Sequence, residues 1–321
     1  MAFHEVGTPS PSADPEAPLR GSGGGGSGGG GARLLRVLFN WGGAKASDYD
    51  SAEARQRLVD PHKGASLLAY VALQLLCLSP TVFMVVLLVV ARLGLVSMFV
   101  FHWVGCVAFP ALFMWVYDGE GAAAVVAFAT RHFASSSARQ WRVGALFFVL
   151  FTLVGLGTAG AVAQWCEFVT EVYVPIKRNS VAAGIQFDPT QSVLFSLYFI
   201  FVNSLIEELF WRGFLLERLG TSKGGILTAS FYYALYHFWV LFALLPTTIG
   251  SMNIWLSLVA MLGLFVFGAV LALLHMGHGI AVSWLIHAAG DAAVCFFLLS
   301  VWWSTWVPQD CPGGSQNMTT V

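Results

Sequence analysis

Charged side chains are scarce in this sequence. Only 10% of its 321 residues are Asp, Glu, Lys or Arg, whereas a soluble domain carries about 25%. Hydrophobic residues make up 57% of the chain, which excludes an ordinary soluble domain. The net charge of −1 gives no bias toward nucleic acid, so we expect no nucleic-acid partner. This composition predicts an all-α, polytopic membrane helix bundle in contact with membrane lipid.

Cysteine is also scarce, and it occurs in no recognisable spacing. The five residues are scattered, at Cys77, Cys106, Cys166, Cys295 and Cys311. No CxxC pair exists, so neither a disulfide framework nor a zinc knuckle is predicted. The HExxH motif of zinc proteases is absent as well. No apolar stretch lies near the start, and we therefore expect no cleavable signal peptide.

Long apolar runs are abundant, and each is close to the 20 residues that a bilayer requires. Between them, residues 118–142 are mixed and suit a helix and loop at the membrane surface. An N-terminal signal at Asp188-Pro-Thr190 begins the fourth helix, and Gly220 stops it after Leu219. About seven transmembrane helices are predicted, over residues 66–91, 95–117, 143–166, 190–219, 224–245, 254–274 and 280–303.

The apolar runs divide the chain into four parts. A Gly/Ser-rich stretch in the first part cannot bury a core, which predicts a flexible tail. The second part holds N-terminal transmembrane helices and loops, the third a helical core, and the last a polar tail. These parts span residues 1–65, 66–190, 191–303 and 304–321.

The distribution of Lys and Arg predicts the orientation. The side that carries the N-terminus holds 13 of these residues and the other side holds 3. Because positive residues accumulate on the cytosolic side, we expect a cytosolic N-terminus. The C-terminal tail would then be luminal or extracellular, in agreement with the glycosylation sequon at Asn317.

Three ionisable residues interrupt the fourth predicted span: Glu207, Glu208 and Arg212. Each costs about 2.5–3.5 kcal/mol within a membrane and therefore suggests function. Glu208 and Arg212 stand four residues apart on one helical face and can pair. Glu207 points about 100° away and is left for chemistry or for a partner on another helix. The alternative is a buried triad that only holds helices together.

Histidines occur in two later spans. His237 lies in the fifth span, and His287 lies in the seventh, with Asp291 four residues later on the same face. Such a group suits general-base activation of water, a proton relay, or a zinc site. The remaining histidines are predicted to be structural or solvated, with His275 and His278 at the cytosolic interface; the others are His4, His62, His102 and His132.

The order of these residues resembles a known family. Glu-Glu-x-x-x-Arg in one span, aromatic-x-x-x-His in the next, and His-x-x-x-Asn/Asp in a later one is the pattern of the CPBP family. This family includes the type II CAAX prenyl endopeptidases and bacterial relatives that process bacteriocins or confer immunity. The resemblance covers about residues 190–295. It includes the glycine-containing segment from Phe267-Gly268 to Trp284, which precedes the last histidine of the pattern.

The resemblance implies a role for each matching residue. Glu207 corresponds to the catalytic glutamate that activates water, and His237 to its partner. His287 and Asp291 correspond to the pair that stabilises the oxyanion. The supporting residues are Glu208, Arg212 and Tyr233, where Tyr233 replaces a commoner phenylalanine. Asparagine is frequent at the last position, and an ionised aspartate would repel an oxyanion. Asp291 must therefore be protonated or orient His287.

The function implied is that of an intramembrane endopeptidase. It would hydrolyse a peptide bond near the C-terminus of prenylated CAAX proteins, with its active site facing the cytosol and the endoplasmic reticulum as the expected location. No cofactor is expected; the alternative is a zinc enzyme with Glu207, His237 and His287 as ligands. Two other functions stay open: a non-catalytic scaffold or immunity protein of the same family, and a proton-coupled transporter. Inverted repeats would favour the transporter, and none is evident.

Overall fold

The structure is a computed structural model that describes residues 65–119, 121–165, 172, 174–245 and 252–303. The two predicted tails therefore lie outside the described residues, apart from Ala65. The described residues form helices and contain no β-strand, as the composition predicts. Seven of these helices are long and apolar enough to cross a membrane, which confirms the predicted fold class. The division into four parts stays a prediction.

The first two spans mix α-helix with the wider π-helix. The first consists of α3 (Ala65–Phe83), with Pro80 inside it, and a π-helical stretch, Met84–Val90. A tight turn at Arg92, which has a positive φ of 57°, leads into the second span. That span runs through α4 (Gly94–Phe99), a π-helical stretch (Val100–Ala108), α5 (Phe109–Phe113) and a last π-helical turn (Met114–Asp118).

The third span begins about one turn earlier than predicted. The short helix α6 (Ala122–Ala134) occupies the mixed segment, and α7 (Ala138–Ala163) follows it. Ser137 caps α7 by accepting a hydrogen bond from the Gln140 backbone, while the Gln140 side chain accepts one from the Ser137 backbone. This capping box fixes the start of the helix. The charges at Arg139 and Arg142 obscured that start in the sequence.

The fourth span carries the acidic stretch and has the predicted boundaries. Asp188 begins it by accepting a hydrogen bond from the Gln191 backbone at 2.8 Å, and Gly220, with a φ of 86°, ends it. Between these residues, α-helical and π-helical segments alternate: α10 (Pro189–Leu197), Tyr198–Asn203, α11 (Ser204–Glu208), Leu209–Leu215 and α12 (Leu216–Leu219).

The last three spans are uninterrupted α-helices: α13 (Lys223–Leu244), α14 (Met252–His278) and α15 (Ile280–Trp303). The predicted end of the sixth span at 274 was one turn too early. Gly279 follows α14 with a φ of 76°, and its backbone N–H donates to the His275 carbonyl at 2.8 Å. A left-handed glycine at this position closes a helix and lets the next one begin at once.

A short helix, α9 (Val174–Ala182), occupies part of the predicted polar loop. The Asn179 side-chain amide donates hydrogen bonds to the carbonyls of Leu244 and Leu245, at 3.1 and 3.0 Å. The last carbonyls of a helix have no partner within it. The loop helix therefore satisfies the end of α13, a contact between distant segments that local pattern cannot predict.

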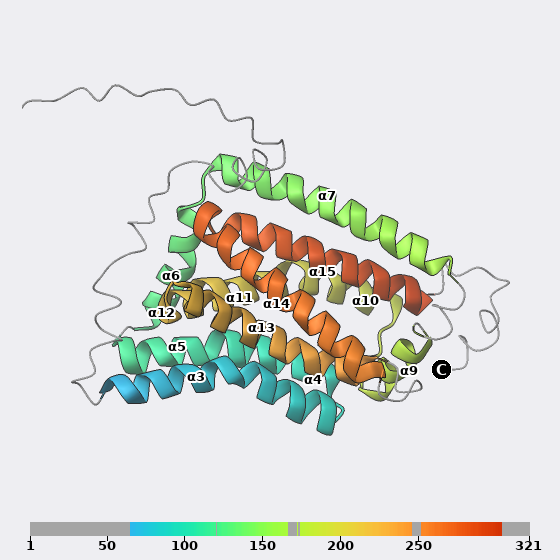
Figure 1. The fold of residues 1–321 in the computed structure, drawn as a ribbon, viewed down its shortest axis with the longest axis horizontal. Coiled ribbons are helices and arrows are strands. Elements are labelled where there is room, and N and C mark those ends of the chain that lie inside the picture. The colour runs from blue at the N-terminus through green and yellow to red at the C-terminus, as the bar shows by residue number, and fades with distance from the viewer. Residues whose placement is uncertain (1–64, 120, 166–171, 173, 246–251, 304–321) are drawn as a thin grey trace, which may run out of the picture. The chain divides into compact units, whose positions relative to one another are not determined.

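The spans are packed in an order that encloses the fourth one. α7 packs along α15, and α13 packs against α14 and α3. α11 contacts α15 and the π-helical part of the second span. Figure 1 shows α7 beside α15, with α3 and α5 on the opposite side of α13. The acidic stretch consequently lies between helices from both halves of the described chain.

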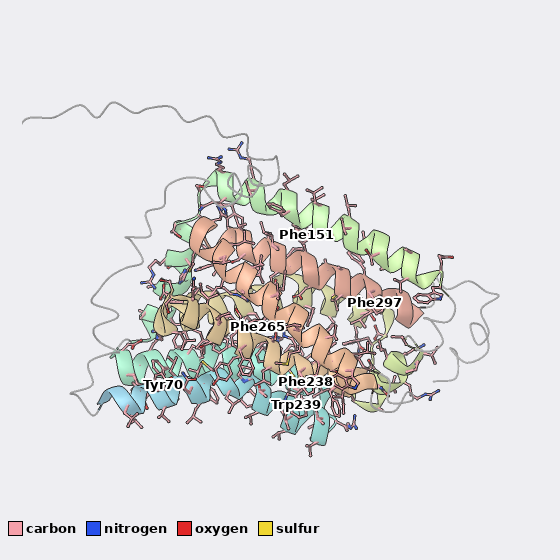
Figure 2. The ribbon with its side chains drawn as sticks, viewed as in Figure 1. Tyr70, Phe151, Phe238, Trp239, Phe265 and Phe297 are labelled. Carbon is pink, nitrogen blue, oxygen red and sulfur yellow. The ribbon has the colours of Figure 1, made fainter. Side chains whose placement is uncertain are left out.

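Helix α7 lies at the outside of the bundle. Only 6% of its most apolar window is buried. Apolar side chains on it are about half exposed, among them Leu146, Leu150 and Phe151. Figure 2 labels Phe151 on this helix. An apolar surface of this kind along a span-length helix is suited to lipid contact.

Candidate active site

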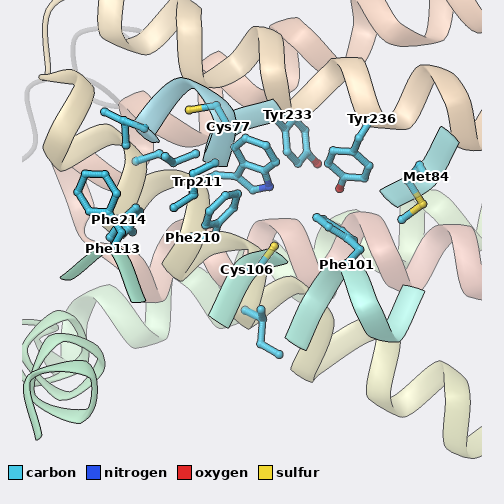
Figure 3. Packing of buried hydrophobic residues seen from close by; sticks show 14 of the residues in the cluster. Cys77, Met84, Phe101, Cys106, Phe113, Phe210, Trp211, Phe214, Tyr233 and Tyr236 are labelled. Atoms are coloured by element: carbon cyan, nitrogen blue, oxygen red, sulfur yellow. The ribbon is translucent and has the colours of Figure 1, made fainter. Parts of the chain in front are cut away.

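Aromatic packing fixes how the fourth and fifth spans meet. Trp211 and Tyr236 stack with ring centroids 5.9 Å apart, and Tyr233 meets Trp211 edge-to-face at the same distance. Figure 3 shows these three rings within one buried cluster, near Phe101 of the second span. Rings that interlock in this way allow little sliding between helices. They hold the polar side chains nearby at a set depth.

The acidic stretch is almost completely buried. Glu207 is 3% exposed, Glu208 0% and Arg212 2%. The helix carrying them widens to π-geometry both before and after α11. Short π-helical insertions are frequent at functional sites. The burial of two carboxylates requires partners for each, since an unpaired buried charge is very costly.

Glu208 is the shared acceptor of the site. Its Oε1 accepts a hydrogen bond from Arg212 Nη1 at 2.7 Å, which confirms the predicted pair, and another from His287 Nδ1 at 2.8 Å. Arg212 also donates to the Gly268 carbonyl at 3.3 Å and lies over the Tyr233 ring at 4.5 Å. This carboxylate therefore joins the fourth span to the seventh, which the sequence did not reveal.

Glu207 is held by groups from three helices. Tyr236 donates a hydrogen bond to Oε2 at 2.5 Å, and Asn203 donates one to Oε1 at 3.2 Å. Nε2 of His102, from the second span, lies 3.5 Å from the same Oε1. A carboxylate offers about four acceptor positions. These contacts leave room for one more donor, such as a water molecule.

His237 is oriented by its own helix. Its Nδ1 lies 2.8 Å from the Tyr233 carbonyl, and its ring lies 3.9 Å from that of Tyr236. A carbonyl can only accept, so Nδ1 carries the hydrogen and Nε2 of the neutral ring is left as an acceptor. The ring also interacts electrostatically with Glu207. His237 can thus serve as a general base next to a carboxylate.

His287 presents its Nε2 to a second group of side chains. That atom lies 3.4 Å from the Tyr233 hydroxyl and 3.8 Å from Asp291 Oδ1. Asp291 Oδ2 accepts a hydrogen bond from the Asn203 amide at 3.2 Å. The shorter contact, from Nδ1 to Glu208, orients the His287 ring. The two alternatives for Asp291, a protonated side chain or one that orients His287, both stay predictions.

The side chains described here do not form a metal site. Among the described residues, no group of three or more His, Cys, Asp or Glu side chains is arranged to hold a metal ion. The alternative of a zinc enzyme with Glu207, His237 and His287 as ligands stays a prediction.

Three residues of the site escaped the sequence analysis. Asn203 stands four residues before Glu207, so the helical spacing could have indicated it. Tyr236 precedes His237, and the sequence does not distinguish it from the other aromatic residues of the fifth span. His102 was predicted to be structural or solvated. It lies inside the second span, is 2% exposed, and contacts Glu207.

Two other histidines are buried outside this group. His275, which was predicted to face the cytosolic interface, is 2% exposed, with its ring centroid 5.7 Å from that of His132. His132 on α6 is 3% exposed, and its Nε2 lies 3.4 Å from Glu217 Oε1. The Glu217 side chain is 27% exposed, so this contact resembles that of His102 and Glu207 in distance but not in burial, and it involves neither Glu207 nor Glu208.

Comparison with known proteins places the site in a family. A search of curated proteins and of solved structures found no match to the chain. The family model described as type II CAAX prenyl endopeptidase Rce1-like matches residues 189–293. This segment contains all seven predicted site residues and nearly coincides with the predicted range. This match, over about a third of the chain, supports membership of the CPBP family that the residue pattern suggested.

Proposed function

We propose that this protein is an intramembrane endopeptidase that hydrolyses a peptide bond near the C-terminus of prenylated CAAX proteins. One observation carries the proposal: Glu207, His237 and His287, from three separate spans, each contact Tyr233 or Tyr236 of α13 within the segment that the family model matches. A carboxylate and an imidazole acceptor together suit the activation of water for hydrolysis.

In the proposed reaction, Glu207 and His237 take a proton from the attacking water. The water oxygen adds to the carbonyl carbon, and the proton is later delivered to the leaving amine as the peptide bond breaks. His287 and a protonated Asp291 donate hydrogen bonds to the negative oxygen of the tetrahedral intermediate. Loss of one such donor typically lowers the rate 10²–10³-fold. Glu208 and Arg212 hold His287 in place through the 2.8 and 2.7 Å contacts.

The family description supports the proposed substrate, and the resemblance to the CPBP family supports the proposed location. We infer a prenylated CAAX protein as substrate, in an internal membrane such as the endoplasmic reticulum, with cleavage on the cytosolic face. The predominance of Lys and Arg on the N-terminal side supports this orientation.

The decisive experiment is a membrane assay on a prenylated CAAX peptide that compares the wild type with Glu207→Gln. The variant should lose hydrolysis while folding normally, because glutamine keeps the size of the side chain but is a poor base. Glu217→Gln makes the same change on the same span, away from the site, and should retain turnover per folded molecule. Substantial turnover by folded Glu207→Gln protein would reject the assignment and favour a non-catalytic or transport function.

We propose a metal-free reaction, and this can be tested separately. Prolonged chelation should leave hydrolysis of the same peptide unchanged, and elemental analysis of purified active protein should find no stoichiometric zinc. One zinc per chain, lost together with activity and restored with it, would decide for a metalloprotease.

A further inference from the structure

The second span contributes a buried histidine to the candidate site. His102 is 2% exposed, and its Nε2 lies 3.5 Å from Oε1 of Glu207, which is itself 3% exposed. This histidine lies outside residues 189–293, so neither the family model nor the sequence pattern assigns it a role. The contact is between spans that are about one hundred residues apart in sequence.

The surroundings of His102 do not explain its polarity. Its ring packs on Phe101 at 4.5 Å and near Tyr198 at 6.2 Å, contacts that a phenylalanine could make equally well. Nδ1 has no hydrogen-bond partner among the described residues, and Nε2 has only the long 3.5 Å contact with Glu207 Oε1. Burying an imidazole without hydrogen bonds is unfavourable. A purely structural role would therefore be served better by an apolar ring.

The nearest acceptor to His102 is the carboxylate that the proposed mechanism uses as a base. Hydrogen bonds in active sites are often long without substrate and shorten when it binds. Asn203 already donates to Oε1, and Tyr236 donates to Oε2. A further donor on Oε1 would limit rotation of this carboxylate and leave its remaining acceptor position for the attacking water.

We propose that His102 is a positioning residue for Glu207, donating from Nε2 to Oε1 during the reaction. The inference rests on the proposed function, since it concerns the same carboxylate. It means that the N-terminal spans, beyond the matched segment, complete the active site rather than only supporting it.

The test compares His102→Phe with His102→Gln in the membrane peptide assay. Phenylalanine keeps the ring and removes both nitrogens, whereas the glutamine amide can donate near the position of Nε2. We expect His102→Phe to lower kcat about 10- to 100-fold with little change in KM, since small misplacement of a reacting group can cost 10²-fold. His102→Gln should recover a substantial part of that loss.

His132→Phe is the matched control, because it removes another His–Glu contact, at 3.4 Å, that involves neither Glu207 nor Glu208. It should leave kcat per folded molecule unchanged. Wild-type kcat in folded His102→Phe, or equal loss in His102→Phe and His102→Gln, would overturn the proposal. If Glu207→Gln retains hydrolysis, the proposed function itself is rejected. If Glu207→Gln loses hydrolysis while His102→Phe keeps the wild-type kcat, only the inference about His102 is rejected.

Discussion

At the scale of single residues, the two adjacent glutamates have separate surroundings. Glu208 accepts from Arg212 and His287, both buried, while Glu207 accepts from neutral donors, Tyr236 and Asn203. The first carboxylate balances a permanent positive charge. The second has an open acceptor position, which suits a group that receives a proton.

Glu208→Gln should therefore destabilise the protein more than Glu207→Gln does. It leaves the Arg212 guanidinium buried without its counter-charge, and breaking a buried pair in this way costs about 3–5 kcal/mol. Thermal unfolding in detergent, together with the yield of folded protein, measures the difference. Equal stability of the two variants would contradict the division of roles, with the wild type measured alongside as the reference.

Asp291 gives a second prediction at this scale. Because Glu208 orients His287, Asp291→Asn should keep most of the hydrolytic activity: the new side chain can still accept from Asn203 and can donate to an oxyanion. Asp291→Ala can neither accept from Asn203 nor donate to an oxyanion, and its rate of hydrolysis should be about 10²–10³-fold lower. Rates on the prenylated peptide, normalised to folded protein, separate the outcomes. A fully active Asp291→Ala enzyme would remove this residue from the site.

At the scale of helices, the close approach of α13 and α14 holds Arg212 and Tyr233 together. The Gly268 carbonyl accepts from Arg212, and a Cβ on this glycine would meet the Tyr233 ring at 3.0 Å. Gly263, on the same helix, has nothing within 4 Å of such a Cβ. The two glycines thus differ in packing while sharing helical geometry.

Gly268→Ala should lower both stability and activity, because the added methyl group displaces the ring that lies between Arg212 and His287. Gly263→Ala is the control and should be neutral or slightly stabilising, since alanine is favoured over glycine in a helix by about 0.5–1 kcal/mol. Unfolding temperatures and peptide turnover of both variants provide the comparison. A Gly268→Ala protein that behaves like Gly263→Ala would show that close packing of α13 and α14 at Gly268 is not needed for stability or activity.

At the scale of the whole molecule, the seven candidate spans of the described residues would put Ala65 and Trp303 on opposite sides of a membrane. A prenylated protein substrate in the cytosol can be reached only if the site opens to that side. The unequal distribution of Lys and Arg supports this orientation.

In sealed vesicles with the cytosolic side outward, added protease should digest a tag at the N-terminus and leave a tag after Val321 protected. Detergent should abolish the protection, which controls for tags that resist digestion in themselves. The reverse pattern would turn the site toward the lumen and rule out cytosolic prenylated substrates.

The sequence by itself determined the fold class and most of the residues in the site. Hydrophobic length fixed the spans, because a bilayer demands about 20 apolar residues for each. Helical spacing determined the Glu208–Arg212 pair, since residues four apart share a face. The scarcity of charge made the few buried ionisable residues conspicuous, and their order identified the family segment.

Tertiary structure alone decided which groups from different helices meet. Periodicity cannot tell that His287 binds Glu208 rather than relying on Asp291, or that Asn203 bridges Glu207 and Asp291. The contact of His102 with Glu207 depends on how the second span packs against the fourth, through aromatic rings that are far apart in the chain. Such contacts depend on the depth and rotation of the packed helices, and local sequence determines neither of these.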